Sequence, residues 1–170
     1  MDSRQLREVL SRDLGRSFGG VYPRDLLPDQ LRPHEKAIVI NTDSHDQPGT
    51  HWVCLYWNGA HVEYFDSYGL PPLHQEIRQF ISRHARHWTY NQNCYQDYST
   101  DVCGHYCVYF LHQRHRGNRR ALDWLFPFPR TSRLSPLQRD HYVAQWFRET
   151  YRKPKRNQGQ TCKCFWQNMY

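Results

Sequence analysis

Hydrophobic residues recur every three or four positions in four stretches of the chain, and this spacing predicts amphipathic helices. The stretches are residues 2–14, 71–88, 102–113 and 135–151. In the first, Asp2 can cap the helix, with Gln5 in the reciprocal capping position. In the last, Ser135 and Gln138 stand in the same two positions.

Apolar runs between these stretches predict β-strands. Residues 37–41 (AIVIN) form a short run that we expect to be a buried strand. Residues 52–57 and 60–65 flank Asn58-Gly59, a pair that favours the tight type I′ turn, so they predict a β-hairpin. Residues 88–95 are expected to be extended.

The chain shows neither an internal repeat nor a linker that would divide it. Glycine and proline between residues 19 and 33 indicate a long irregular connection. We therefore expect one α+β domain over residues 1–170, with a basic and mobile tail from about residue 152.

The chain is basic, with a formal net charge of +7 at pH 7. Positive residues cluster at 83–87, 114–120 and 152–156. Charge of this size favours polyanions such as nucleic acid, although a solvated basic surface without a partner would explain each cluster alone. Taken together, the three clusters favour contacts with DNA phosphates.

Other features narrow the class of protein. No run of eighteen apolar residues is present, so we expect no membrane span. Residues 1–5 do not begin a secretion signal, so we expect the protein to act inside a cell, where disulfides are rare. The spacing of the six cysteines fits no zinc template, and we expect no metal site.

Cys103 is the candidate nucleophile. It follows three possible helix caps, Ser99, Thr100 and Asp101, and should lie in the first turn of a buried helix. The helix dipole there favours the reactive thiolate, and Gly104 lets a substrate approach closely. The alternative is a packed core cysteine, so the assignment depends on its partners.

His51 and Asp66 are the candidate base and its orienting acceptor. His51 precedes one strand of the predicted hairpin and Asp66 follows the other, so both should lie at the same open end. The alternative for Asp66 is a turn residue before Gly69. Gln96 could supply a side-chain donor to an oxyanion beside the backbone N–H of Cys103.

This order of residues resembles the adenovirus-type protease (adenain) family of cysteine proteases, which belongs to a larger group that includes SUMO-deconjugating enzymes. The motifs are His51-Trp52, then Phe65-Asp66-Ser67-Tyr68-Gly69, then Gln96 followed by Asp101-Val102-Cys103-Gly104-His105-Tyr106-Cys107. The Gln-x6-Cys-Gly spacing is the most specific part. The likeness extends to residues 11–15, 33–42, 134–136 and 165–169.

The resemblance implies a small mixed β-sheet flanked by helices, and catalysis by His51, Asp66, Gln96 and Cys103. It also implies a monomeric endopeptidase that cleaves virion precursor proteins at Gly-rich sites, within particles in the host nucleus. Viral DNA and a peptide from a capsid precursor would act as cofactors. Cys94 is the only cysteine between Asp66 and Gln96. The family's cysteine that bonds the activating peptide should lie well upstream of the glutamine, whereas Cys94 lies two residues before Gln96. Non-covalent or tail-mediated activation therefore stays open.

Two alternatives remain at this point. One is a protease that removes a ubiquitin-like modifier, because that group shares the same order of site residues. The other is a non-catalytic, basic DNA-packaging protein that keeps the protease fold. The presence of all four site residues favours an enzyme.

Overall fold

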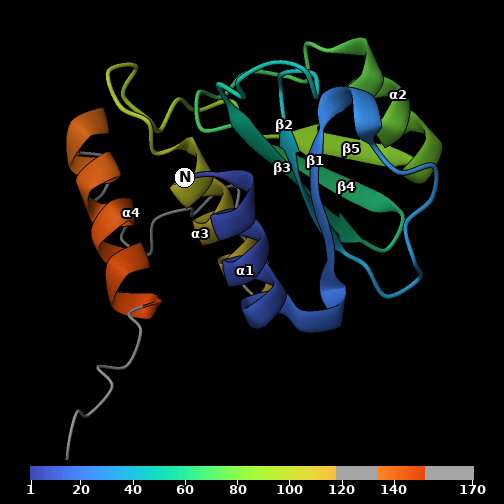
Figure 1. The fold of residues 1–170 in the computed structure, drawn as a ribbon, viewed down its shortest axis with the longest axis horizontal. Coiled ribbons are helices and arrows are strands. Elements are labelled where there is room, and N and C mark those ends of the chain that lie inside the picture. The colour runs from blue at the N-terminus through green and yellow to red at the C-terminus, as the bar shows by residue number, and fades with distance from the viewer. Residues whose placement is uncertain (118–133, 152–170) are drawn as a thin grey trace, which may run out of the picture.

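A computed structural model describes residues 1–117 and 134–151 and shows a mixed five-stranded sheet with helices on both faces (Figure 1). The strands lie in their sequence order: β1 (Phe18–Pro23), β2 (Ala37–Asn41), β3 (Trp52–Asn58), β4 (His61–Phe65) and β5 (His87–Tyr90). The two outer pairs are parallel and the two inner pairs are antiparallel. The predicted α+β class with a small mixed sheet is therefore confirmed.

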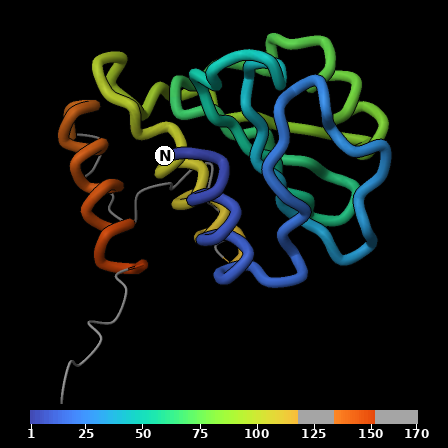
Figure 2. The backbone as a smooth tube through the Cα atoms, viewed as in Figure 1, coloured from blue at the N-terminus to red at the C-terminus, as the bar shows by residue number. Residues whose placement is uncertain are grey.

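Two separate hydrophobic clusters hold the layers together. The helices are α1 (Ser3–Leu14), α2 (Gln75–His84), α3 (Cys103–His115) and α4 (Pro136–Thr150), and two short 3-10 turns cover Gly15–Ser17 and Arg24–Leu26. Helices α1 and α3 lie against one face of the sheet, and α2 covers the other. Helix α4 packs on α3, on the side away from the sheet, as the backbone trace also shows (Figure 2).

Both predicted capping boxes are present. The Asp2 side chain accepts a hydrogen bond from the Gln5 N–H, and the Ser135 side chain accepts one from the Gln138 N–H. In each case the glutamine side chain accepts a hydrogen bond from the backbone N–H of the cap residue. These local contacts fix where α1 and α4 begin.

The hairpin is confirmed as well. Asn58 pairs with His61 across the turn, and Gly59 has a φ of 63°, which a side chain would disfavour. Strands β3 and β4 run antiparallel from this turn. The start of β3 and the end of β4 therefore meet at the opposite end of the hairpin.

Strand β1 was not expected from the sequence. Its glycines were interpreted as part of an irregular connection, yet residues 18–23 pair in parallel with β2. Gly19 and Gly20 lie where the register shifts, and a Cβ on Gly20 would come 2.8 Å from the Tyr22 hydroxyl oxygen. Gly20 also has a φ of 136°, which side chains rarely adopt, so glycine serves the backbone inside a strand rather than in a loop.

The second helix is shorter than expected. Helix α2 begins at Gln75, not at Pro71, and ends before Trp88, which lies in β5. Only the stripe of Ile77, Phe80 and Ile81 is buried, whereas Leu73 is exposed. The apolar spacing continued past both ends of the helix because neighbouring segments also carry apolar residues.

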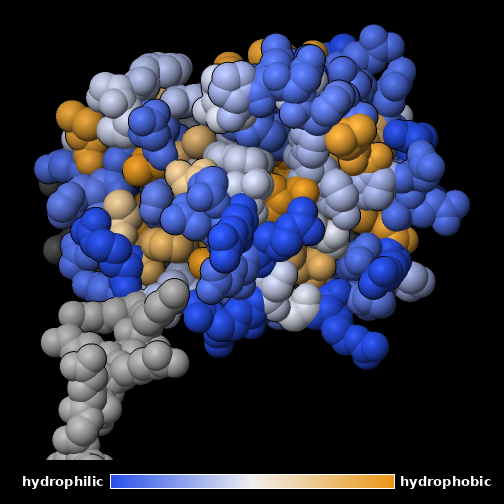
Figure 3. Space-filling view, in the orientation of Figure 1, coloured by the Kyte–Doolittle hydropathy of each residue, from blue (hydrophilic) through white to orange (hydrophobic). Residues whose placement is uncertain are grey.

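The part of the chain that the structure describes contains no helix that is long and apolar enough to cross a membrane. The face seen in Figure 3 is mostly hydrophilic, with hydrophobic residues scattered across it. The expected tail from residue 152, and with it Cys162 and Cys164, lies outside the described residues.

Candidate active site

His51 and Asp66 meet at the open end of the β3–β4 hairpin, as their positions in the sequence predict. His51 Nε2 lies 3.0 Å from Asp66 Oδ1, and the two side chains are 15% and 5% exposed. Asp66 Oδ1 also accepts the Tyr68 N–H at 2.8 Å. Because Nε2 is engaged by Asp66, the other ring nitrogen, Nδ1, is the one that can exchange a proton with a nucleophile.

The electrostatics of His51 favour the imidazolium. Burial is the largest single effect and lowers the pKa of His51. Hydrogen bonds to Asp66 and Cys103 and the negative charges of these two groups raise the pKa, and together they outweigh burial. The net effect raises the pKa of His51 to about 10. The imidazolium is the acid form of His51 that can protonate a leaving group beside Cys103.

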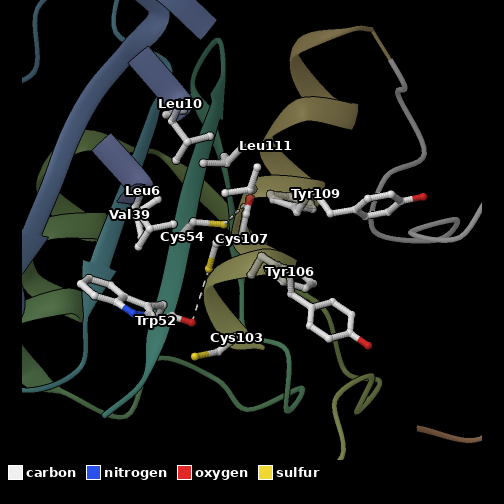
Figure 4. Packing of buried hydrophobic residues seen from close by; sticks show 14 of the residues in the cluster. Leu6, Leu10, Val39, Trp52, Cys54, Cys103, Tyr106, Cys107, Tyr109 and Leu111 are labelled. Atoms are coloured by element: carbon white, nitrogen blue, oxygen red, sulfur yellow. Dashed lines mark hydrogen bonds between the residues drawn. The ribbon is translucent and has the colours of Figure 1, made fainter. Parts of the chain in front are cut away.

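Cys103 is the first residue of α3 and is 6% exposed (Figure 4). The expected side-chain cap is wrong: Val102 is the N-cap residue, and no side chain caps the helix. Thr100 instead bonds within the preceding loop and to α4. The first backbone N–H groups of α3 therefore have no side-chain acceptor from a cap and can face a substrate oxygen.

Gly104 permits close packing beside the nucleophile. A Cβ at this position would lie 3.0 Å from Met1 Cβ and 3.4 Å from Trp52 Cδ1. The Trp52 indole N–H donates to the Met1 carbonyl oxygen at 3.0 Å, which fixes the ring. The Trp52 ring thus packs beside the first turn of α3.

Gln96 is buried in the loop that leads to Cys103. Its Oε1 accepts the Ser67 hydroxyl at 2.7 Å, and its Nε2 donates to the Thr100 carbonyl oxygen at 2.6 Å. One N–H of the amide is therefore held by the loop, and a weaker contact joins Nε2 to Thr100 Oγ1 at 3.4 Å. Its role as an oxyanion donor stays a prediction.

Two residues that support the site were not identified from the sequence. Tyr68 stacks on the His51 ring with centroids 4.8 Å apart, and the exposed Tyr98 stacks on Tyr68 at 5.0 Å. The β3–β4 register, continued past the pair of Cys54 and Phe65, would set Tyr68 opposite His51. The hairpin pattern could therefore have revealed this contact.

Asn91 fixes the backbone of Asp66 from the segment after β5. It donates to the Asp66 carbonyl oxygen at 2.6 Å and accepts the Asp66 N–H at 2.9 Å. Nothing in the local sequence around Asn91 indicates this contact, because it joins residues 25 positions apart.

The basic clusters are only partly on the surface. Arg114 was counted among the candidates for phosphate contact, but it is buried, pairs with Glu63 and lies over the Tyr56 ring. That assignment is wrong for Arg114. Arg83 and Arg86 are exposed, whereas residues 118–120 and 152–156 lie outside the described residues.

Comparisons with known proteins agree with a thiol protease but do not define a family. No protein-family model matches the chain. A protein of Acanthamoeba polyphaga mimivirus, named "Putative thiol protease", is 31% identical over 86 residues, which are 44% of this chain and 28% of that protein. The chain thus spans less than a third of the curated relative that it matches.

Two solved structures align with parts of this chain. The ASFV protease structure aligns with 66% of this chain and 44% of its own at 18% identity, with a TM-score of 0.45. ChlaDub1 from Chlamydia trachomatis aligns with 69% of this chain and 60% of its own at 15% identity, with a TM-score of 0.47. The relative's name supports the class that the sequence predicts, while the adenain family itself does not occur among these matches.

The arrangement of His51, Asp66 and Cys103 suits acyl transfer. A thiolate can attack a carbonyl carbon, the imidazolium can protonate the leaving group, and a carboxylate keeps the ring oriented. The sequence predicted all three positions, and the fold brings them together from two layers: the hairpin supplies the base and its acceptor, and α3 supplies the thiol.

Proposed function

We propose that this chain is a cysteine endopeptidase, with Cys103 as the nucleophile, His51 as the general base and acid, and Asp66 as its orienting acceptor. The observation that carries the proposal is the hydrogen-bonded His51–Asp66 pair, 3.0 Å apart, beside the thiol at the first residue of α3. This combination activates a thiol without a metal ion.

In the proposed reaction the Cys103 thiolate attacks the scissile carbonyl carbon and forms a tetrahedral oxyanion. The backbone N–H of Cys103 and the Gln96 amide would stabilise that charge. The C–N bond breaks as the His51 imidazolium protonates the leaving amine. Neutral His51 then takes a proton from water, the hydroxide attacks the thioester, and the C–S bond breaks to release the carboxylic acid and restore the thiolate–imidazolium pair.

Within this class we favour a viral maturation protease that cleaves virion precursor proteins at Gly-rich sites. Support comes from the resemblance to adenain along the chain and from the viral origin of the thiol protease that it matches in sequence. On this proposal the enzyme acts in the virion and in the host nucleus, with a capsid-precursor peptide as activator. The net charge of +7 supports double-stranded DNA as a further cofactor.

Removal of a ubiquitin-like modifier is the second candidate, because the same order of histidine, aspartate, glutamine and cysteine serves that reaction. A Leu-x-Gly-Gly reporter peptide and a ubiquitin-like fusion, each assayed with and without DNA, separate the two. The maturation protease should cleave the peptide and respond to DNA. Faster cleavage of the fusion, with no effect of DNA, would favour the second candidate.

The same assay tests the specificity that Gly-rich sites demand. A pocket that accepts Gly-Gly leaves no room for side chains next to the scissile bond, so replacing either Gly of the reporter with Leu should nearly stop cleavage. Cys103→Ala is the inactive control. If wild type cleaves neither substrate in the presence of DNA and candidate peptides, the chain is not a protease of this kind.

A further inference from the structure

The loop of residues 96–102, here called the oxyanion loop, connects Gln96 to the nucleophile. It therefore carries both donors of the proposed oxyanion hole, the Gln96 amide and the backbone N–H of Cys103. Within the loop, Gln96 Nε2 donates to the Thr100 carbonyl oxygen and the Thr100 N–H donates to the Asp97 carbonyl oxygen. The position of Thr100 thus decides where the Gln96 amide points.

A carboxylate from a different part of the chain holds this loop. Asp140, in the second turn of α4, is 4% exposed. Its Oδ2 accepts the Thr100 hydroxyl at 2.6 Å and the Asp97 N–H at 3.0 Å. Its Oδ1 accepts the Tyr106 hydroxyl at 2.8 Å. Asp140 thereby ties the oxyanion loop and α3 to the same point on α4.

These three donors are neutral, and burying an ionised carboxylate is unfavourable unless hydrogen bonds stabilise it. A hydrophobic side chain at position 140 would avoid that cost but would leave the Asp97 N–H and the Thr100 hydroxyl without this acceptor. A carboxylate can accept all three bonds at once because both oxygens carry lone pairs. The chemistry of the residue therefore matches the geometry of the loop.

We infer that Asp140 is a positioning residue for catalysis, which holds the oxyanion loop in the conformation that aims the Gln96 amide at the substrate oxygen. The inference rests on the proposed protease function. The path of contacts runs from Asp140 to the Thr100 hydroxyl, and from the Thr100 carbonyl to Gln96. Asp140 itself does not touch the substrate.

The consequence for the reaction is specific to the oxyanion step. Without Asp140, Thr100 loses its strongest side-chain contact and the Gln96 amide loses its fixed acceptor. A displacement of about 1 Å in such a group can lower a rate by roughly 10²-fold. Substrate binding and the nucleophilicity of Cys103 do not pass through this path, so KM and thiol reactivity should stay near their wild-type values.

The test compares Asp140→Ala, Asp140→Asn and wild type with the Gly-Gly reporter. Asp140→Ala should lower kcat by about 10–100-fold and change KM by less than about twofold. Asp140→Asn keeps one acceptor oxygen for the loop, so it should recover most of the lost kcat. The rate at which iodoacetamide alkylates Cys103 should be unchanged in both variants, because alkylation forms no oxyanion. A peptide aldehyde, which does form an oxyanion on Cys103, should bind Asp140→Ala more weakly.

Tyr151→Phe is the matched control. Tyr151 caps the other end of α4, and its hydroxyl donates to Asp13 Oδ2 at 2.9 Å, so this variant loosens the same helix without touching the oxyanion loop. It should keep the wild-type kcat. If Tyr151→Phe and Asp140→Ala lower kcat equally, or if Asp140→Ala keeps the wild-type kcat, the inference is wrong.

Failure of the proposed function has a different signature. If wild type cleaves no reporter, the protease proposal fails, and amide hydrogen exchange in residues 97–102 tests the positioning on its own. Faster exchange in Asp140→Ala than in Tyr151→Phe would support the hold on the loop. Equal exchange in the two variants would overturn it.

Discussion

The Ser67 hydroxyl donates to Gln96 Oε1 at 2.7 Å and thereby decides which end of the Gln96 amide faces the oxyanion loop. Since Ser67 takes the carbonyl end, the nitrogen must lie on the side of Thr100. The Ser67 carbonyl oxygen also accepts the N–H groups of Tyr95 and Gln96. A single residue after the hairpin thus orients both the backbone and the side chain of the proposed oxyanion donor.

This relationship predicts a graded effect on catalysis. Gln96→Ala should lower kcat by about 10²–10³-fold, the usual result of removing one oxyanion donor. Ser67→Ala should lower kcat less, because the amide stays in place but can rotate. Steady-state kinetics with the reporter peptide measure both variants. A Gln96→Ala enzyme with the wild-type kcat would remove Gln96 from the site.

Cys103 should carry the nucleophilic chemistry. Cys103→Ala should abolish cleavage while leaving the fold intact, and iodoacetamide should label Cys103 before the other cysteines because its thiol is hydrogen-bonded to the His51 base. Cys94→Ala is the matched control, since Cys94 is the more exposed thiol of the two. Mass spectrometry of the labelled peptides gives the order, and labelling of Cys94 ahead of Cys103 would contradict the assignment.

The raised pKa of His51 predicts the alkaline limit of activity. The imidazolium must protonate the leaving amine, so kcat/KM of wild type should fall as pH rises through about 10. In Asp66→Asn the His51 ring loses its negatively charged partner, so the alkaline fall in kcat/KM should occur at lower pH than in wild type. His51→Ala should remove nearly all turnover, and Asp66→Ala should leave more. If kcat/KM falls at the same alkaline pH in wild type and Asp66→Asn, Asp66 is not what raises the pKa of His51.

The same histidine makes folding depend on pH. Because the pKa of His51 is higher in the folded state, its contribution to stability is fully present below about pH 6.5 and is lost as pH rises towards 10. His105 behaves in the opposite sense. Burial, with the nearby positive charges of the N-terminal amine and of Arg148, lowers the pKa of His105 to about 4, so the folded state resists protonation and stability falls as pH drops from about 6.5 to 4.

Urea unfolding at several pH values measures both effects. His51→Gln should flatten the free energy of unfolding between pH 6.5 and 10, and His105→Gln should flatten it between pH 4 and 6.5. Each variant serves as the control for the other. If both variants flatten the same range, the two assignments are incorrect.

DNA should bind without sequence preference and stimulate cleavage at low salt. The logarithm of the binding constant should fall linearly with the logarithm of salt concentration, with a slope of magnitude about 0.9 per phosphate contacted. Neutralising Arg152, Lys153, Lys155 and Arg156 together should flatten this slope. Arg4→Gln with Arg16→Gln, two exposed arginines outside the clusters, should change it less. Binding without any rise in reporter cleavage would withdraw the activation proposal.

The elements that the sequence predicted are those with local signals. Helix caps and tight turns depend on residues only a few positions apart, as in α1, in α4 and at Asn58-Gly59. The position of this turn sets the register of the hairpin and so brings His51 next to Asp66. Strand β1 was missed because glycine packing against β2 resembles a loop in sequence.

The residues that support the site could not be identified in the same way. Asn91 and Asp140 contact Asp66 and the oxyanion loop across 25 and about 40 positions, and their side chains are common at surfaces. The expected cap at Ser99, Thr100 or Asp101 failed for a related reason. The Thr100 hydroxyl found a stronger acceptor on α4, and no pattern near Cys103 reports the presence of that helix.

The place of α4 in the chain has a consequence for the timing of synthesis. A nascent polypeptide that has left the ribosome only as far as α3 already contains His51, Asp66, Gln96 and Cys103. It lacks Asp140, so on the inference above its oxyanion loop is not yet held. On that inference its kcat would stay about 10–100-fold below that of the complete enzyme until α4 has emerged and docked.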